Sequence, residues 1–559
     1  MVKARLLWVD DEIDLLKPYI LFLEEKGYGT QCVNNGRDAI ELCRSQRFDI
    51  VFLDEQMPGL SGLETLVELH SSYPGMPVVM VTKSEDEGIM NRAIGKKIAD
   101  YLIKPVNPNQ VLMSIKKILE QDERMTEVVT QEYHDLFNLL IGEIEDCRTP
   151  DDWISVYKKL VRWELRLDQT QSPLREMLAV QKAEANRLFA KFIRKNYEQW
   201  IIGSQDRAGR VDGVAGAGRV GYSAPAGGVG RTDRTDGFGP DRPVLSPDLF
   251  ERFVFPSVDK GEKLFFILID NFRFDQWQVV KDIVGESFTC REDIYFSILP
   301  TATPYARNAV FSGLMPRRLS EMFPDCWVDE SEDEGKNLHE ELFINSHLER
   351  HGRKCNFSYH KINRSLEGEK LVARFAELEK YDLNLLVFNF IDLLSHARTE
   401  SRMIRELAPD ESAYRSLTRS WFLHSPLPDL LAKIAEKGYK AVLTTDHGSI
   451  RVKKGVKVLG DRETGVNLRY KVGKNLGYDP KRVFDIIRPE NAGLPSPNMS
   501  TRYIFAVNDD FFVYPNNYNH YQSYYEDSFQ HGGVSMEEMM IPVVFLEPRT
   551  KIQEPRLKV

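Results

Sequence analysis

Short apolar runs that each end in polar residues open this chain of 559 residues. The runs ARLLWV, FDIVFL, PVVMV and DYLI are followed, in that order, by Asp10-Asp11-Glu12, Asp54, Thr82 and Lys104-Pro105. Each run is typical of a buried strand in a parallel sheet, and open sheets of this kind place their sites at the strand ends. The pattern therefore predicts an N-terminal α/β domain with one polar site.

The polar residues at these strand ends suggest a metal and a phosphate. Clustered carboxylates at Asp10, Asp11 and Asp54 favour a hard cation such as Mg²⁺. A hydroxyl at Thr82 and an ammonium at Lys104 could hold a phosphate on Asp54. The alternative is that these residues only form turns, since Asp and Pro are common there.

These motifs together resemble those of response-regulator receiver domains, and the resemblance covers residues 1–121. It implies a flavodoxin-like fold in which Asp54 is the phospho-acceptor and Asp10 and Asp11 help to bind Mg²⁺. It also implies that Thr82 and Lys104 contact the phosphoryl group and that Tyr101 is an aromatic switch.

Residues 122–202 carry a helical pattern with almost no glycine. In MTEVVTQEYHDLFNLLIGEIEDC, apolar residues recur near i, i+3, i+4 and i+7. Thr149-Pro150-Asp151-Asp152 predicts the start of a second helix, and Ser172-Pro173 starts a third that runs to about Gln199. The segment is predicted to be a helical bundle that transmits a signal, presents a dimer face, binds a partner or serves as a rigid spacer.

Residues 203–243 change abruptly to Gly, Arg, Asp and Ala. Too few large apolar side chains are present to offset the entropy of ordering, so we expect a disordered linker. The Gly/Arg content could also indicate RNA contact, although acids interleave the arginines and only Tyr222 and Phe238 could stack on bases.

A second α/β domain is predicted over residues 244–559. The apolar runs KLFFILI, LNLLVFNFI and YKAVLTT precede Asp270, Asp392 and Asp446. If the runs are strands of one sheet, their ends converge on one rim, which brings residues distant in sequence into a single site.

The chemistry of this rim is that of a metal site. Asp392 and His396 are four residues apart, so a helix would place both on one side, and Asp446-His447-Gly448 gives adjacent ligands beside a glycine that permits a tight turn. Thr303 in PTATPYARN and His531 in QHGG complete the set. Three carboxylates, three imidazoles and a hydroxyl suit two divalent metals and a phosphoryl-accepting alcohol. Alternatively, Thr303 caps a helix and the Asp residues merely end strands.

The ordered set resembles the alkaline phosphatase superfamily, most closely its PglZ-type members and the nucleotide pyrophosphatase/phosphodiesterase branch. Thr301-Ala302-Thr303-Pro304 followed by Gly313-Leu314-Met315-Pro316 matches that branch, and the spacing selects Thr303 as nucleophile. The resemblance implies one metal on Asp270, Thr303, Asp446 and His447, and another on Asp392, His396 and His531. Zinc fits this mixture of imidazole and carboxylate best, with Mn²⁺ as an alternative.

Two positions depart from the family pattern. The group that holds the non-bridging phosphate oxygens has no unambiguous counterpart, and Asn271, Arg273 and Arg307 are the candidates. His520 is a rival to His531 as a ligand.

A nucleotide or oligonucleotide phosphodiester is the expected substrate. Residues 451–474 are rich in cations, which suit phosphates, and the segment FFVYPNNYNHYQSYY supplies aromatic rings that suit bases. The alternative is a solvated loop beside a Tyr-rich packing surface.

Charge, hydropathy and cysteine spacing limit which other functions the chain is expected to have. The formal net charge is −10, so nothing draws the whole chain toward nucleic acid or anionic membrane, and with no helix-turn-helix signal we expect no direct DNA binding. No apolar run approaches the roughly 18 residues of a membrane span, and the N-terminal apolar stretch is too short for a signal peptide, so a cytoplasmic protein without membrane insertion is expected. Six scattered cysteines without CxxC spacing predict neither disulfides nor a cysteine zinc site.

The order of receiver, helical segment and PglZ-like domain resembles the response regulators associated with type IX secretion. That resemblance implies a sensor histidine kinase as phosphate donor, homodimerisation on phosphorylation, and a secretion-system or sigma-factor component as a further partner. The expected function is a response regulator in which phosphorylation of Asp54 controls a two-zinc phosphodiesterase with Thr303 as nucleophile. The alternative is a non-catalytic, metal-stabilised docking module.

Overall fold

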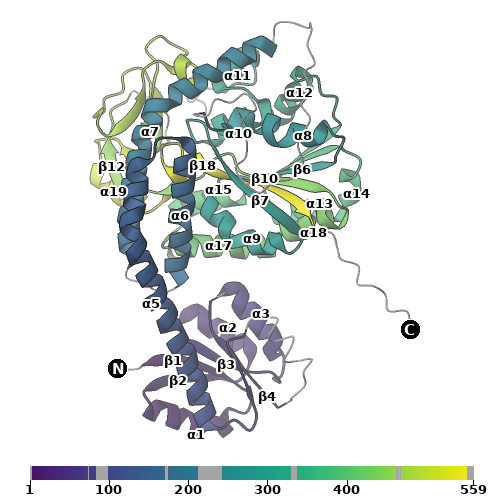
Figure 1. Ribbon diagram of the computed structural model, residues 1–559, viewed down its shortest axis with the longest axis vertical. Coiled ribbons are helices and arrows are strands. Elements are labelled where there is room, and N and C mark those ends of the chain that lie inside the picture. The colour runs from purple at the N-terminus through teal and green to yellow at the C-terminus, as the bar shows by residue number, and fades with distance from the viewer. Residues whose placement is uncertain are drawn as a thin grey trace. The chain divides into compact units, whose positions relative to one another are not determined.

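A computed structural model of the chain describes residues 3–73, 75–83, 98–169, 174–211, 242–328, 337–460, 465 and 467–549. The chain divides into two compact units, Met1–Leu136 with Glu164–Arg175 and Phe137–Trp163 with Glu176–Val559 (Figure 1). Among the described helices, none combines the length and apolarity needed to cross a membrane. All six cysteines are free thiols.

The N-terminal sheet has five parallel strands in the order β2-β1-β3-β4-β5. The strands are β1 (Ala4–Val9), β2 (Tyr28–Val33), β3 (Ile50–Asp54), β4 (Val78–Thr82) and β5 (Asp100–Ile103). This order is that of flavodoxin-like sheets, so the predicted fold is confirmed. Each apolar run of the sequence is a strand, and the polar residues that end them meet at one edge.

Helices cover both faces of this sheet. They are α1 (Ile13–Glu25), α2 (Gly36–Ser45), α3 (Gly62–Ser72) and the first turns of α5 (Pro108–Asp146). Side chains of successive strand residues point to opposite faces. Accordingly, Leu6 and Trp8 pack in the core with α1 and α5, whereas Leu7 and Val9 pack with α2 and α3.

Three long helices form the helical segment, as predicted. They are α5, α6 (Pro150–Gln169) and α7 (Leu174–Val211). The predicted start of α6 is confirmed, because the amide of Asp152 donates to Thr149 Oγ1 (3.3 Å) and the amide of Thr149 donates to Asp152 Oδ2 (2.8 Å).

The expected end of the third helix is wrong. Helix α7 continues past Gln199 to Val211, into the predicted linker 203–243. Residues 203–211 contain no proline and include Gln205, Arg207 and Ala208, whose intrinsic preference for helix is high. Residues 212–241, which carry most of the predicted disorder and both candidate stacking residues of that linker, lie outside the described residues.

A six-stranded mixed sheet with the order β7-β18-β10-β6-β9-β8 forms the centre of the C-terminal domain. Its strands are β6 (Leu264–Ile269), β7 (Phe288–Phe296), β8 (Phe357–Ile362), β9 (Leu383–Phe388), β10 (Lys440–Thr444) and β18 (Met540–Pro548). Strands β8, β9, β6 and β10 run parallel to one another, whereas β18 is antiparallel to both β10 and β7. The predicted α/β class is confirmed.

Helices lie on both faces of this sheet, with α10 and α12 on one face and α9, α17 and α18 on the other (Figure 1). The helices are α8 (Phe255–Val258), α9 (Phe274–Gly285), α10 (Thr303–Ser312), α11 (Pro316–Met322), α12 (Glu340–Arg350), α13 (Ser365–Ala373), α14 (Phe375–Leu378), α15 (Phe390–Glu400), α16 (Arg402–Leu407), α17 (Glu411–His424), α18 (Leu427–Glu436), α19 (Tyr518–Tyr525) and α20 (Met536–Met539). A buried aromatic core between the sheet and α10 and α12 includes Phe250, Phe266 and Phe311.

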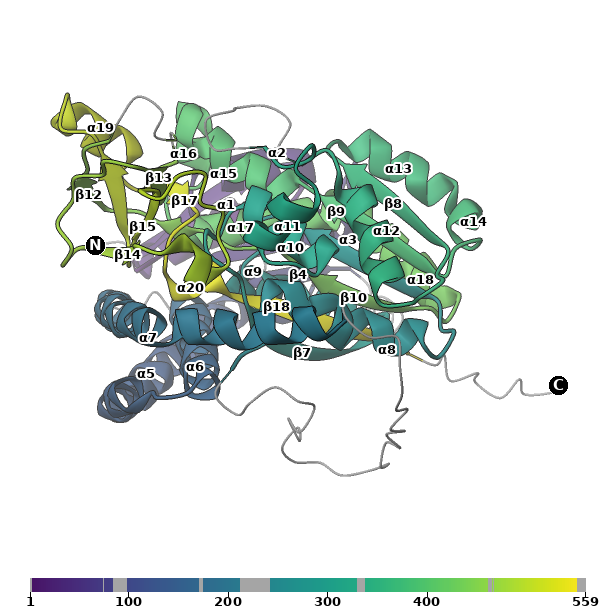
Figure 2. The same cartoon turned by 90° about the horizontal axis from the view of Figure 1, so that it is seen from above.

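Three small sheets complete the C-terminal domain (Figure 2). They pair β11 (Ile450–Arg451) with β17 (Phe529–Gln530), β12 (Lys454–Lys457) with β16 (Asp510–Val513), and β15 (Arg502–Ala506) with both β13 (Tyr470–Gly473) and β14 (Val483–Ile486). The short strand β17 leads directly into His531, so these sheets position one candidate ligand.

His347 of α12 is expected to make the protein less stable in mild acid. Its ring is buried against Phe250 and Phe255, and burial lowers its pKa well below the usual value of 6.5. The folded state therefore keeps this imidazole neutral, whereas the unfolded chain protonates it below about pH 6.5, so the free energy of unfolding falls as the pH falls through that value. In His347→Gln the slope of unfolding free energy against pH between about 7 and 5 becomes shallower, as measured by denaturant titration.

His424, on the exposed surface of α17, provides the matched control. The His424→Gln variant is expected to keep the slope of the unaltered protein. Equal slopes in His347→Gln and the unaltered protein would contradict the assignment.

Candidate metal centre and nucleophile

Three neighbouring parallel strands bring the predicted carboxylates to one edge of the large sheet. Strand β6 lies between β9 and β10, and Asp270 follows β6 directly. Asp446 follows β10 after one intervening residue. Asp392 departs from the prediction, because β9 ends at Phe388 and Asp392 lies in the first turn of α15. The strands therefore converge as predicted, although helix α15 carries the third carboxylate.

Asp270, Asp446 and His447 form a buried cluster whose ligand atoms all lie within 4.8 Å of one another. Thr303, the first residue of α10, lies beside it and is only partly buried. Its Oγ1 is 3.0 Å from His447 Nε2 and 3.4 Å from Asp270 Oδ1. The hydroxyl thus contacts the cluster from a position that a substrate can approach.

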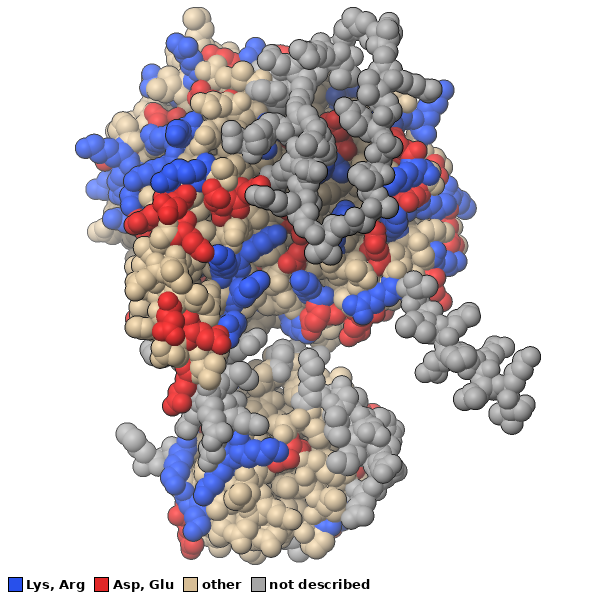
Figure 3. Space-filling model, viewed as in Figure 1, with Lys and Arg blue, Asp and Glu red and all other residues tan. Residues whose placement is uncertain are grey.

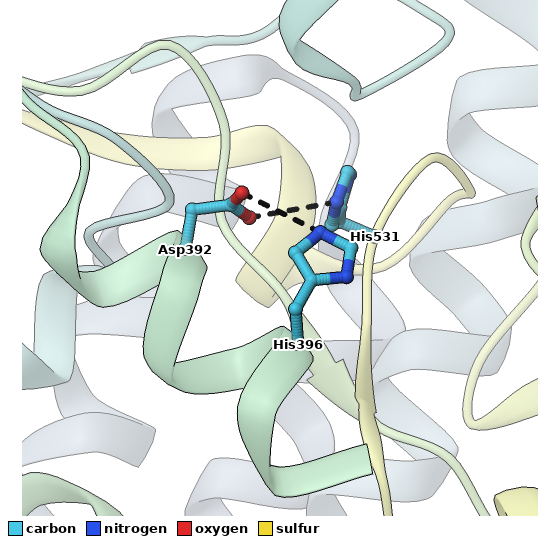
Figure 4. Close-up of side chains that lie close together, drawn as sticks. All are labelled: Asp392, His396 and His531. Carbon is cyan, nitrogen blue, oxygen red and sulfur yellow. Dashed lines mark ion pairs between the residues drawn. The ribbon is translucent and has the colours of Figure 1, made fainter. Parts of the chain in front are cut away.

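A second cluster contains Asp392, His396 and His531, again with ligand atoms within 4.8 Å of one another. Figure 4 shows both imidazoles facing the carboxylate of Asp392. His396 Nε2 lies 3.4 Å from Asp392 Oδ2, and His531 Nε2 lies 3.7 Å from Asp392 Oδ1. The spacing of four residues places Asp392 and His396 on one side of α15, as predicted, and the loop after β17 supplies His531.

The two clusters are adjacent. The rings of His447 and His531 stack with their centroids 4.3 Å apart. Asn271, in the left-handed conformation with φ of 60° directly after Asp270, donates from Nδ2 to Asp392 Oδ1 at 3.2 Å. The arrangement can therefore hold a pair of cations close to a single hydroxyl.

The imidazoles are oriented through their Nδ1 atoms. His447 Nδ1 lies 3.1 Å from the carbonyl oxygen of Gly448, and His531 Nδ1 lies 3.2 Å from that of Thr301. A proton on Nδ1 satisfies these carbonyls and leaves Nε2 free to bind a metal. Burial and the neighbouring His447 lower the pKa of His531 to about 3, so this imidazole is neutral near pH 7, as a metal ligand must be.

Negative charge dominates the first cluster. Burial, reinforced by the carboxylates of Asp446 and Asp392, raises the pKa of Asp270 well above its usual value, although Arg307 opposes the rise. Arg307 is buried, donates from Nε to Asp446 Oδ2 at 3.0 Å, and forms an ion pair with Asp270. One guanidinium faces these carboxylates, so bound cations would offset the remaining charge.

In the second cluster, the pKa of the carboxylate Asp392 shifts in the opposite direction from that of Asp270. Burial alone would raise the pKa of Asp392, but the interaction with the neighbouring imidazoles, first of all the hydrogen bond from His396, outweighs it and lowers the pKa. An ionised carboxylate and a neutral imidazole are the protonation states that bind divalent metals. The donor set of each cluster therefore fits a zinc-type cation.

The three candidates for a phosphate-binding group differ in their contacts. Arg273 donates from Nε to Asp275 Oδ1 at 2.9 Å and also pairs with Glu411. Burial would lower the pKa of Arg273, but these acids outweigh it and raise the pKa. Its guanidinium thus belongs to a buried ion network, whereas Arg307 contacts the first cluster and Asn271 contacts Asp392 in the second.

His520 is separate from both clusters. It lies on the exposed helix α19, where its ring packs against Tyr521 and Tyr524 with centroid distances of 5.3 and 6.3 Å. Neither cluster found among the described residues includes it. The geometry favours His531 as the third member of the second cluster.

Thr301 has a role that the sequence did not reveal. The amide of Gly532 donates to Thr301 Oγ1 at 3.0 Å, and this hydroxyl donates to the carbonyl of Gly533 at 2.9 Å. Thr301 therefore ties the loop of His531 to the segment of Thr303. The repeated threonine in the sequence TATP is the signal that could have suggested two roles.

Gly448 is required for a reason other than the predicted tight turn. A Cβ atom at this position would lie 2.1 Å from the carbonyl oxygen of Glu537. The backbone of the DHG motif thus packs directly against the chain near α20. Gly532, by contrast, has a φ of 118°, which favours glycine for conformational reasons.

The predicted receiver residues also meet at one site. Asp10, Asp11 and Asp54 place their carboxylates within 4.8 Å of one another, which fits a Mg²⁺ site. Lys104 Nζ lies 2.8 Å from Asp10 Oδ2 and 3.0 Å from Asp54 Oδ2. Burial raises the pKa of Asp54, while Lys104 opposes that rise.

Thr82 and Tyr101 lie on the neighbouring strands β4 and β5. Thr82 is buried and its hydroxyl donates to Glu55 Oε2 at 2.6 Å. Tyr101 is half-buried. Glu55, a partner that the sequence patterns did not indicate, thus engages the hydroxyl predicted to contact a phosphoryl group.

The cationic and aromatic segments contain packing contacts, as the alternative of a Tyr-rich packing surface predicts. Lys457 lies over the ring of Tyr518 at 4.9 Å, and the Tyr518 hydroxyl donates to the carbonyl of Gly455, so this part is packing surface. Tyr521 and Tyr524 are 38% and 36% exposed, and both rings pack against His520 and Tyr525. Basic and acidic side chains are interspersed over the face shown in Figure 3.

Comparison with known families divides the chain into three parts. Residues 249–546 match the model of the BREX system PglZ alkaline phosphatase-like domain. Residues 123–201 match the PorX response regulator linker domain, and residues 6–116 match the response regulator receiver domain. The receiver match implies a histidine kinase as the phosphate donor.

Curated relatives resemble part of the chain. The alginate biosynthesis transcriptional regulatory protein AlgB of Pseudomonas syringae pv. tomato is 36% identical over 118 residues, which cover 21% of this chain and 26% of that protein. The transcriptional regulatory protein CpxR homolog of Haemophilus influenzae is 33% identical over 120 residues, covering 21% of this chain and 51% of the relative. The chain thus spans about a quarter of the length of the first relative and about half of the length of the second.

Solved receiver domains are similar over a comparable share. The CheY-like response regulator receiver domain of Methanospirillum hungatei has 29% identity and covers 22% of this chain and 98% of its own, with a TM-score of 0.21. The signal receiver domain of a putative Luxo repressor protein from Vibrio parahaemolyticus has 25% identity, covers 21% of this chain and 91% of its own, and has a TM-score of 0.21.

Proposed function

This chain belongs to the PglZ alkaline phosphatase-like family and has the architecture of a PorX-type response regulator, and from that premise we propose that it is a signal-controlled phosphodiesterase. In this proposal the functional parts are the receiver 1–121, the helical bundle 122–202, the linker 203–243 and the catalytic domain 244–559. Thr303 is the nucleophile, and two zinc ions occupy the two clusters.

The position of Thr303 carries the proposal. Its hydroxyl contacts His447 and Asp270 at 3.0 and 3.4 Å and is the partly exposed member of an otherwise buried cluster. A helix N-terminus also favours negative charge, and Thr303 is the first residue of α10. Both features support an oxygen that attacks phosphorus as an alkoxide.

The reaction proceeds in two displacements. When bound, the metals supply positive charge that lowers the pKa of an alcohol and stabilises the leaving oxygen. Thr303 Oγ1 releases its proton to solvent and forms a bond to phosphorus, while the bond from phosphorus to the leaving alkoxide breaks. Water then breaks the bond between Thr303 and phosphorus and restores the hydroxyl. We assign the non-bridging oxygens to Arg307, whose proximity to Asp270 and Asp446 supports this choice among the three candidates.

Nucleotide or oligonucleotide diesters are the substrates that these surroundings favour. The partly exposed Tyr521 and Tyr524, which pack with His520 and Tyr525, form an aromatic surface for bases. Lys453, whose side chain is 55% exposed and lies 3.7 Å from Asp509, adds a cation for phosphates. Base stacking with neighbouring cations is the recognition mode of single-stranded nucleic acid.

The test compares the rate of hydrolysis of an activated diester with that of the matching monoester. Hydrolysis of bis(p-nitrophenyl) phosphate in the presence of zinc, faster than that of p-nitrophenyl phosphate, is expected for a phosphodiesterase. Absence of turnover with zinc measurably bound would instead favour the alternative of a docking module for a transcription or secretion component.

Regulation is proposed to begin at Asp54. Phosphorylation by a sensor histidine kinase, with Mg²⁺ on Asp10, Asp11 and Asp54, leads to a homodimer and controls hydrolysis. The PorX-type linker supports a role in type IX secretion, with a secretion-system or sigma-factor component as partner.

The Asp54→Asn variant is expected to lose phosphorylation completely, because an amide cannot form the acyl phosphate. Intact-protein mass spectrometry after incubation with acetyl phosphate and Mg²⁺ measures the added phosphoryl group. Asp49, an exposed carboxylate just before β3, provides the matched control, and Asp49→Asn should be phosphorylated normally. Equal phosphorylation of Asp54→Asn and the unaltered chain would exclude Asp54 as the acceptor.

A further inference from the structure

Helix α7 of the linker is built into the support of the candidate metal centre. From Glu176 onward it belongs to the same compact unit as the PglZ domain, and Figures 1 and 2 show it against that domain. The rings of Phe189 and Trp200 pack against Phe296 of β7, with centroids 6.1 and 5.8 Å away. These two aromatic contacts anchor helix α7 to β7.

Asn186 makes two buried hydrogen bonds from α7 to the chain at α20. The amide of Met536 donates to Asn186 Oδ1 at 2.7 Å, and Asn186 Nδ2 donates to Glu537 Oε2 at 2.9 Å. Lys182, one turn earlier, lies 3.3 Å from Glu537 Oε1. Asn186 is 3% exposed, so water does not compete for these bonds.

The segment held by Asn186 borders both candidate metal loops. The amide of Gly448, next to His447, donates to the carbonyl of Glu538 at 3.2 Å. The amide of Gly533, two residues after His531, donates to Glu538 Oε1 at 2.8 Å. A displacement of this segment would therefore move the neighbours of two imidazoles that belong to different clusters.

Tyr197, three helical turns further along α7, holds the segment of the nucleophile. The amide of Leu299 donates to the Tyr197 hydroxyl at 2.7 Å, and Tyr197 is fully buried. Leu299 lies two residues before Thr301, whose carbonyl orients His531, and four before Thr303. One helix thus contacts the backbone behind the nucleophile and behind the metal ligands.

We propose that Asn186 and Tyr197 are positioning residues through which α7 of the linker sets the geometry of Thr303, His447 and His531. The inference rests on the proposed function of these three residues. A misplacement of about 1 Å in a reacting group can cost about a hundredfold in rate, and loss of a residue that orients a metal ligand typically costs about 10- to 100-fold in metal affinity or activity. The PorX-type linker is therefore part of the catalytic support and not only a spacer.

The test uses the full chain with Tyr197→Phe and Asn186→Ala. Tyr197→Phe removes one oxygen and keeps the ring, so the fold is preserved; its kcat for bis(p-nitrophenyl) phosphate is expected to fall about tenfold with KM nearly unchanged. Asn186→Ala is expected to weaken zinc binding by about tenfold or more, measured by competition with a fluorescent zinc chelator.

Two controls separate positioning from general destabilisation. Tyr133→Phe removes a hydroxyl from a fully buried tyrosine of α5, and Asn196→Ala removes an asparagine of α7 that donates to the carbonyl of Phe192 in its own helix. Both are expected to keep kcat and zinc affinity, whatever their effect on the midpoint of thermal unfolding.

The outcomes distinguish the two proposals. Failure of the unaltered chain to hydrolyse either ester would overturn the proposed function, while the zinc competition still tests the inference. Zinc affinity and kcat of Asn186→Ala and Tyr197→Phe equal to those of the controls would overturn the role of α7.

Discussion

The Thr303→Ala variant is expected to lose diester hydrolysis by at least about a thousandfold while the chain still binds zinc. The proposed nucleophile supplies the bond to phosphorus. Other hydroxyls also contact the first cluster: Ser297 Oγ, which is fully buried, donates to the carbonyl of Asp446 at 2.7 Å, and Thr445 Oγ1 lies 3.4 Å from Asp446 Oδ1. Thr445 also donates to the carbonyl of His447 and is fully buried, so it is not accessible to a substrate. Steady-state hydrolysis of bis(p-nitrophenyl) phosphate measures the loss.

A conservative variant controls for damage to the site. Thr303→Ser keeps a hydroxyl at the N-terminus of α10 and should retain a large part of kcat, while zinc content by atomic absorption should match in both variants. Hydrolysis by Thr303→Ala within tenfold of the unaltered protein would show that another oxygen attacks phosphorus.

Sequence patterns predicted which carboxylates lie together where the residue ends a strand or closely follows it. Asp54, Asp270 and Asp446 end or follow buried apolar runs, and parallel neighbours bring such ends together without further information. The helical spacing of Asp392 and His396 was informative for the same reason, since four residues correspond to about one turn. Local rules were sufficient for these groups.

Boundaries were less predictable where two local preferences compete. The run LNLLVFNFI is apolar throughout, yet β9 ends at Phe388 and α15 begins at Phe390. A short apolar run does not distinguish a buried strand from the start of a buried helix. The end of α7 was predicted too early for a different reason: the glycine content indicated a linker, yet good helix formers in the same segment continue the helix to Val211.

Contacts between distant residues were not predictable at all. Asn186 and Glu537 are separated by 351 positions, and Tyr197 and Leu299 by 102, with no pattern in the sequence that links them. Two sets of ion pairs likewise depend on how the helices pack: Arg273 pairs with Asp275, and Arg307 pairs with Asp270 and Asp446. Choosing among the cationic candidates required the tertiary structure.

Removal of zinc is expected to abolish hydrolysis and to lower the midpoint of thermal unfolding by several degrees. The buried Asp270 and Asp446 lie near the partly buried Asp392, and burial with mutual repulsion raises the pKa of Asp270. Cations that bind only the folded chain relieve that repulsion, and a ligand at about 1,000 times its Kd contributes about 4 kcal/mol of stability. Differential scanning fluorimetry with and without a chelator, paired with the diester assay, measures both effects.

The same treatment of Thr303→Ala separates metal binding from chemistry. Because its two clusters of carboxylates and imidazoles are unchanged, the chelator should lower its unfolding midpoint nearly as much as that of the unaltered chain, although no hydrolysis is present to lose. Added zinc should restore the midpoint in both proteins and hydrolysis only in the unaltered one. Undiminished hydrolysis by the zinc-free protein would show that the metal centre takes no part in the mechanism. Arg307 would then be the positive charge that stabilises the leaving and non-bridging oxygens.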